Sequence, residues 1–258
     1  KVSQAATEWQ NRPLDSLYMI VWMDGIVFKV RENGKVINKT VYLCVGLNKE
    51  GLKEVLGMWI GKNESAAFWM GVLTDLKARG VEDILITVTD NLNGFTETIK
   101  SVFPAFTTQI CVVHQIRNSC RYVVWKEKKE FTADLKNIYN APTKEAAEME
   151  LDNFEQKWGA KYPYAIRSWR NNWEELTVFF DFPVEIRKII YTTNLIENLN
   201  GKIRKYTKNK LSFPNDDALK KSVYLAINEI EKKWYQPIWN WALIFNQFIT
   251  IFENRIQV

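Results

Sequence analysis

The stretch Ile84–Phe95, ILITVTDNLNGF, carries the strongest fold signal in the chain. It opens with a mostly apolar run over 84–88, of the kind found in a central strand that is covered on both faces. Asp90 follows at the end of this run. Because ligands and reacting groups gather at the carboxyl ends of strands in an open α/β sheet, Asp90 is a candidate site residue. Its other interpretation is an ordinary N-cap for the helix that follows.

The composition is that of a soluble globular protein. Of the 258 residues, 47% are hydrophobic and 25% are charged, which is enough to build a sizeable core. The formal net charge of +5 is compatible with a polyanionic partner without requiring one. The three cysteines, Cys44, Cys111 and Cys120, form no framework spacing. They indicate a reducing compartment, and we expect no disulfide.

The most apolar stretch and the start of the chain exclude two further classes. Trp239–Phe252 is interrupted by amide side chains and is too short to span a bilayer. No signal peptide opens the chain. Because it begins at Lys1 rather than at a methionine, and the next residues have a helical pattern, we expect a fragment of a longer protein.

A second acidic residue lies inside an apolar strand. The residues of Tyr18–Val30 are apolar on both alternating faces, Met19 and Val27 on one and Trp22 on the other, which predicts a strand covered on both faces. Asp24 lies in its middle. An unpaired carboxylate there would cost several kcal/mol, so Asp24 needs a structural Lys or Arg, a network of donors, or a metal ion.

The strands around these two acids can be placed in order. Asn33-Gly34 is a strong hairpin signal, and it separates the first strand from a second over Val36–Val45. A turn then leads to a third strand over Glu54–Ile60. These strands form an antiparallel meander.

Two α/β crossovers follow the meander. A helix over 68–76 ends at Gly80 and leads to the strand at Ile84; a helix over Phe95–Val102 then leads to a fifth strand over Thr107–Val113. The resulting order, β-β-β-α-β-α-β, is that of the ribonuclease H-like fold, in which the first and fourth strands carry acidic residues. We therefore predict an α/β protein with a mixed five-stranded sheet and flanking helices.

An all-helical insertion interrupts this α/β core. No strand pattern appears between residues 117 and 191, so the core is divided into 1–116, with the five strands, and 192–258, with C-terminal helices. Three helices of the insertion are marked by apolar residues at helical spacing. These are Phe131, Leu135 and Ile138; Ala147, Leu151, Phe154 and Trp158; and Ile166, Trp169, Trp173 and Leu176.

The helix predicted over Leu195–Tyr206 carries a third acid. It follows the capping residues Thr192-Thr193-Asn194. Its apolar stripe is Ile196, Leu199, Ile203 and Tyr206, and beside this stripe runs a face with Glu197, Asn200, Gly201, Arg204 and Lys208. Glu197 is either a solvent-exposed glutamate or a third acidic ligand. Two further helices are expected, over Asp217–Trp234 and Ile238–Phe252.

Several spaced motifs occur together in one order. They are Asp90-x-x-x-Gly94-Phe95, Phe103-Pro104, Gln109 and Cys111-x-x-His114, with the blocks EVLGMWIGKNESAAFW, CVVHQIRNS and YTTNLIENLN. In these motifs the chain resembles the Mutator-type transposases, a superfamily that includes many bacterial insertion-sequence enzymes. The resemblance runs from about Asn11 to Arg255.

This resemblance implies a DDE catalytic domain with Asp24, Asp90 and Glu197 as its acidic triad. It implies that Cys111 and His114 close the fifth strand near the active site, with His114 close to the scissile phosphate. It further implies that an N-terminal DNA-binding region is missing and that residues 117–191 are the insertion domain of such enzymes. The expected partners are the terminal inverted repeats and target DNA, bound by a homodimer or higher oligomer in the bacterial cytoplasm, at the nucleoid.

Three converging carboxylates require metal. Each pair at about 4 Å repels by roughly 4 kcal/mol at an effective dielectric constant of about 20. Two divalent cations offset this repulsion, and oxygen ligands select Mg²⁺ or Mn²⁺ over zinc. In phosphodiester cleavage and strand transfer, one ion activates the nucleophile and the other stabilises the departing 3′-oxygen. We expect Asp24 to bridge both ions, Asp90 to be a further ligand and Glu197 to bind one ion.

Cys111 and His114 also have the spacing of half a zinc site. The other half is missing, because Cys120 lacks a partner and His114 is the only histidine. The alternative for Cys111 is ordinary burial in the core.

Basic and aromatic residues are candidate DNA contacts. A run of charge is often only a solvated face, but the second basic run shares its helix with Glu197, so phosphate contacts beside the metal ions are expected. A tryptophan of the insertion is a candidate for stacking on an unpaired base. The basic candidates are Arg117, Arg121, Lys126, Lys128, Lys129, Lys202, Arg204, Lys205, Lys208 and Lys210, and the aromatic ones are Trp125, Trp169 and Trp173.

Three functions fit these residues. The first is a transposase that cleaves and rejoins DNA at the ends of its element. The second is a ribonuclease H-like nuclease or resolvase, which only hydrolyses. The third is a domesticated DNA-binding regulator, which the three acids disfavour because a binding module has no use for carboxylates facing DNA.

Overall fold

The computed structural model describes residues 1–63, 65–90, 95–105, 107–191 and 195–257. The chain divides into two compact units, one of Lys1–Thr107 with Asn194–Val258 and one of Thr108–Thr193. Each unit is described separately below. In the described part of the chain, no helix has both the length and the apolar character needed to cross a membrane.

A five-stranded mixed sheet has the strand order β3-β2-β1-β4-β5. The antiparallel meander consists of β1 (Leu17–Glu32), β2 (Lys35–Leu47) and β3 (Lys53–Gly61), and β4 (Asp83–Thr89) runs parallel to β1. The edge strand β5 (Thr107–Ile110) contains the boundary between the two units. This order confirms the predicted ribonuclease H-like α/β fold and makes β1 and β4 adjacent.

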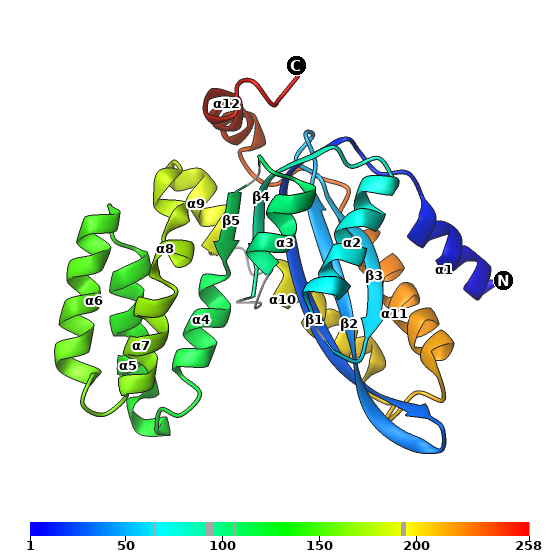
Figure 1. Cartoon of the computed structure of the whole chain (residues 1–258), viewed down its shortest axis with the longest axis horizontal. Coiled ribbons are helices and arrows are strands. Elements are labelled where there is room, and N and C mark those ends of the chain that lie inside the picture. The colour runs from blue at the N-terminus through cyan, green and yellow to red at the C-terminus, as the bar shows by residue number, and fades with distance from the viewer. Residues whose placement is uncertain (64, 91–94, 106, 192–194, 258) are drawn as a thin grey trace. The chain divides into compact units, whose positions relative to one another are not determined.

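Helices cover both faces of the sheet in the first unit (Figure 1). On one face, Trp69 of α2 and Phe95 of α3 pack edge to face in a buried cluster with strand residues such as Tyr18. On the other, α10 contacts β1 and α11 contacts α10 and β3. The helices of this unit are α1 (Val2–Asn11), α2 (Ala66–Ala78), α3 (Phe95–Val102), α10 (Leu195–Thr207), α11 (Asp216–Glu231) and α12 (Trp241–Ile251).

The loop after α10 is fixed to β1 by backbone hydrogen bonds. The N–H of Phe213 donates to the carbonyl of Lys29, and the N–H of Arg31 donates to the carbonyl of Phe213, each at 2.8 Å. The Phe213 ring is buried and packs edge to face on Phe28. These contacts hold the end of α10 against the strand that carries Asp24.

The second unit is a cluster of short helices. A buried glutamine links its two ends: Gln109 Nε2 donates to the carbonyl of Leu176, and Gln109 Oε1 accepts from the N–H of Phe179. The apolar residues predicted as buried faces of α5 and α6 are buried. The elements are α4 (Val112–Ser119), α5 (Trp125–Tyr139), α6 (Lys144–Trp158), α7 (Pro163–Asn171), α8 (Trp173–Leu176), the 3₁₀ helix η1 (Val178–Asp181) and α9 (Val184–Tyr191).

Two predicted boundaries in this unit were wrong. The fifth strand ends at Ile110 rather than at Val113, because Gln109 Nε2 takes the Ile110 carbonyl and α4 begins at Val112. The helix predicted over 166–176 is two helices. Asn172, with φ −100° and ψ 7°, lies outside helical geometry at the junction and donates through its amide to Gln115 Oε1.

Two burial predictions in the first unit were also wrong. Val27 is 47% exposed, because β4 pairs only with Leu17–Met23 and the second half of β1 extends beyond it. Tyr206 is 59% exposed and lies at the edge of the α10 stripe rather than in it. The predicted caps at 192–194 and the turn at 91–94 lie outside the described residues.

Candidate metal centre

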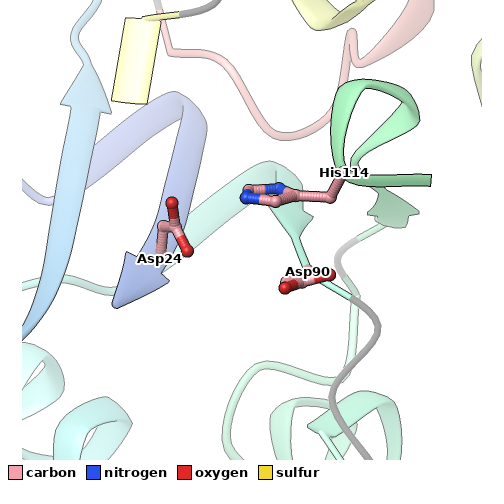
Figure 2. A group of neighbouring side chains, drawn as sticks. All are labelled: Asp24, Asp90 and His114. Carbon is pink, nitrogen blue, oxygen red and sulfur yellow. The ribbon is translucent and has the colours of Figure 1, made fainter. Parts of the chain in front are cut away.

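The sheet brings two of the predicted acids together. In the parallel pairing of β1 with β4, Met23 lies opposite Thr89. Asp24 and Asp90 are the next residues along the same direction, so both side chains start from the same level of neighbouring strands. Their carboxylates offer oxygens within 4.8 Å of one another (Figure 2). Two half-buried acids at this distance form a centre of negative charge suited to a cation.

Both oxygens of Asp24 accept hydrogen bonds. The N–H of Gly25 donates to Oδ1 at 2.7 Å, and Asn200 Nδ2 donates to Oδ2 at 2.7 Å. These donors fix the orientation of the carboxylate. A network of donors was one of the three alternatives that the sequence left open for this acid, and these two hydrogen bonds belong to it.

Helix α10 places Glu197 on the side of Asp24. Glu197 precedes Asn200 by three residues, so the two side chains share a face of the helix. Glu197 is half-buried. Among the described residues it does not join Asp24 and Asp90 in a group of ligand atoms within 4.8 Å. The structure thus gathers the two aspartates and places Glu197 on the helix face beside them.

The side-chain oxygen of Asn200 is a further polar atom beside Asp24. This atom, Oδ1, is buried and accepts no hydrogen bond from the part of the chain that the structure describes. A buried acceptor of this kind is costly unless a donor reaches it. Asn200 therefore offers a hydrogen-bond acceptor directly beside the Asp24 carboxylate.

Cys111 and His114 lie in the second unit. Cys111 is the N-cap of α4 and is buried, as ordinary core burial predicts. His114 lies one turn into α4 and is also buried. Among the described residues, no cysteine belongs to a group of candidate metal ligands.

Comparison with known proteins decides the family. The model of the family described as "Transposase, Mutator family" matches residues 1–237, nearly the whole chain. The chain belongs to the Mutator family of transposases. This assignment confirms the resemblance drawn from the spaced motifs.

Curated relatives carry the same description. A probable transposase for an ISRM3-like insertion sequence element of Sinorhizobium fredii is 44% identical over 99% of the chain, and the transposase for ISRM3 of Rhizobium meliloti is 44% identical over 98%. A probable insertion-sequence transposase of Corynebacterium diphtheriae is 41% identical over 87%. The chain spans 64% of the length of the first two relatives and 66% of the third.

The basic residues predicted to contact DNA are exposed except for Lys128, but those on α10 do not form one surface. At 3.6 residues per turn, Arg204 is close to the direction of Asn200, whereas Lys202 and Lys205 point to the opposite side. Lys202 and Lys205 line a groove of about 390 Å³ with residues of and after α11. The remaining candidates, Arg117, Arg121, Lys126, Lys129, Lys208 and Lys210, are exposed, and Lys128 is half-buried.

Burial separates the three candidate tryptophans. Trp125, the first residue of α5, is 88% exposed. Trp169 and Trp173 are buried, and Trp169 Nε1 donates to Ser119 Oγ at 2.8 Å. A buried ring has no free face for a base, so base stacking by Trp169 or Trp173 is corrected to a core role. Trp125 stays a candidate.

Sequence interpretation missed two sets of residues. Asn200 was placed on the correct helix face but given no role, although its position three residues after Glu197 was the available signal. The groove residues Tyr206 and Lys233 were missed because Lys233 lies just after α11, far along the chain from the basic run of α10.

Proposed function

We propose that this chain is the catalytic part of a DNA transposase, which cleaves DNA at the ends of its element and joins those ends to target DNA. Family membership supports the class of enzyme. The observation that carries the chemistry is the pair of carboxylates with oxygens within 4.8 Å of one another, Asp24 in the middle of β1 and Asp90 directly after the end of the neighbouring parallel strand β4.

The donor set fits hard divalent cations. Asp24 and Asp90 supply carboxylate oxygens, the ligand type that Mg²⁺ and Mn²⁺ prefer. Glu197 would supply the third carboxylate from α10, with Asp24 shared between two ions. By the family resemblance, His114 would lie close to the scissile phosphate. When bound, the ions would activate the attacking oxygen and stabilise the departing 3′-oxygen.

The residues around the acids would orient Asp24 and contact the substrate. The Gly25 N–H and the Asn200 amide orient the Asp24 carboxylate by their hydrogen bonds. Asn200 Oδ1 faces no donor among the described residues, so it can accept from a polar group of the substrate or from water. Arg204 shares this side of α10 and would contact a phosphate next to the acids.

DNA is the proposed partner throughout. Arg117, Arg121 and Trp125 are exposed in the second unit and would contact DNA near a cleaved end. The enzyme is proposed to act in the bacterial cytoplasm as a dimer or higher oligomer on the two ends of one element. The exposed lysines proposed to contact DNA on and after α10 are Lys202, Lys205, Lys208 and Lys210.

The test is strand joining. The chain is incubated with Mg²⁺, a labelled DNA end of its own element bearing a free 3′-hydroxyl, and a target plasmid. We expect covalent joining with the wild type, none with Asp24→Asn or Asp90→Asn, and wild-type joining with the exposed-acid control Asp217→Asn. Hydrolysis without joining would identify a nuclease instead, and metal-dependent joining by either aspartate variant would refute the site.

A further inference from the structure

A basic groove lies between α10 and the end of α11. Its volume is about 390 Å³. It belongs entirely to the first unit. Its lining residues are Lys202, Lys205, Tyr206, Lys208, Glu229, Ile230 and Lys233.

The groove is distinct from the metal centre. Successive residues of a helix are rotated by about 100°, so Lys202 and Lys205 lie about 200° and about 140° around α10 from Asn200. Asn200 donates to Asp24, whereas Lys202 and Lys205 line the groove against α11. A ligand held in the groove would therefore lie behind the helix that carries Glu197.

The charges of the groove favour a polyanion. Four of its lining residues are lysines and one is an acid, Glu229, which forms an ion pair with Lys232 at the end of α11. A further lysine, Lys53, lies close by on β3. Burial, and then the positive charge of Lys202, lowers the pKa of Lys53. This crowding of like charges would be relieved by a bound anion.

An aromatic ring lies among these lysines. Tyr206 is 59% exposed although the apolar stripe of α10 ends beside it. Exposed aromatic rings in positively charged grooves are the usual platforms on which unpaired bases stack. Paired bases of a duplex offer no free face to such a ring, so the combination favours a single strand over a duplex.

We propose that the α10–α11 groove binds a single strand of DNA, with Lys202, Lys205, Lys208 and Lys233 contacting its phosphates and Tyr206 stacking on a base. This inference rests on the proposed function, because a transposase exposes unpaired strands while it cuts and joins DNA. The groove is a second DNA site, separate from the strand at Asp24.

The test measures binding of a fluorescent oligothymidine to the chain without divalent metal, over a range of salt concentrations. Removing two phosphate contacts by Lys205→Ala with Lys233→Ala should flatten the slope of log K against log salt by about 1.4. Tyr206→Ala should weaken binding by about 5-fold to about 150-fold, and Tyr206→Phe should restore it. The matched control Lys35→Ala with Lys77→Ala removes two exposed lysines elsewhere and should leave the slope unchanged.

The outcomes are distinguishable from those of the joining assay. The inference would be overturned if the groove variant and the control variant gave the same salt slope or lost the same amount of affinity. It would also be overturned if the groove bound a duplex more strongly than the single strand. Groove-dependent binding in a chain that joins no DNA would contradict the proposed function alone, and joining without groove-dependent binding would contradict this inference alone.

Discussion

The two sides of α10 use the same helix for opposite electrostatic purposes. On one side, Asn200 donates to Asp24, and Glu197 shares that face next to a pair of acids. On the other, Lys202 and Lys205 line a groove with Tyr206. The first side concentrates negative charge and the second concentrates positive charge. A helix whose apolar stripe is buried in the core can therefore contribute residues to two separate sites, one on each side of that stripe.

The surroundings of the carboxylates differ between the sheet side of α10 and the end of α11. On the acidic side, two N–H donors fix the orientation of the Asp24 carboxylate. At the end of α11, Glu231 is half-buried, and burial raises its pKa even though the Val55 N–H donates to it. The Asp24 carboxylate is thus oriented by hydrogen bonds, whereas burial disfavours the charged form of Glu231.

The largest expected effect is that of Glu197→Gln. Losing one ligand charge from the acidic side should lower Mg²⁺-dependent strand cleavage by about 10³-fold, or about 4 kcal/mol in the barrier, while DNA binding stays normal or becomes stronger. Single-turnover cleavage and a gel-shift assay measure the two quantities. The control Glu148→Gln changes an exposed glutamate of α6. Cleavage at the wild-type rate would remove Glu197 from the site.

A smaller effect is expected from Asn200→Ala. Because Asn200 orients Asp24 and is not itself a proposed metal ligand, its loss should weaken Mn²⁺ affinity or cleavage by about 10-fold to about 100-fold without abolishing either. Asn198→Ala, an exposed neighbour on the same helix, is the matched control. A calorimetric Mn²⁺ titration that gives one affinity for all three proteins would show that the hydrogen bond to Asp24 has no role in binding.

Glu231→Gln should have the smallest effect, on stability only. Because the folded pKa of Glu231 lies above its unfolded value of about 4.3, the free energy of unfolding falls as pH rises from that value through the folded pKa. Glutamine keeps an acceptor for Val55 and has no charge to bury. The melting temperature of the variant minus that of the wild type should therefore be larger at pH 7 than at pH 4. The change should be about 2–4 °C for each kcal/mol of free energy of unfolding. A difference in melting temperature that is the same at both pH values would contradict the shift.

Much of the fold followed from the sequence, because its signals are local. The hairpin at Asn33-Gly34 and the apolar run before Asp90 fix the strand order, and an acid in the middle of β1 then meets the acid that follows β4. Glu197 needed the family resemblance, since a glutamate on a helix surface carries no signal of its own. The break at Asn172 and the exposure of Val27 depend on partners distant in sequence, Gln115 and the length of β4.

The groove was beyond sequence interpretation for a related reason. Basic residues that are neighbours in the sequence do not share a surface on a helix, and α10 places Lys205 and Arg204 on different sides. Lys233 joins Lys205 only through the packing of α11 on α10. Asn200 likewise gained a role only when the packing of α10 on β1 brought its amide to Asp24.

The most direct test of the central claim, that Asp24, Asp90 and Glu197 hold divalent cations, is a calorimetric Mn²⁺ titration of the wild type and of Asp24→Asn, Asp90→Asn and Glu197→Gln, with Asp217→Asn as the control. We predict saturable binding of two ions by the wild type and the control, with at least one ion lost or bound much more weakly in each of the three variants. Wild-type stoichiometry and affinity in any one of them would contradict the account.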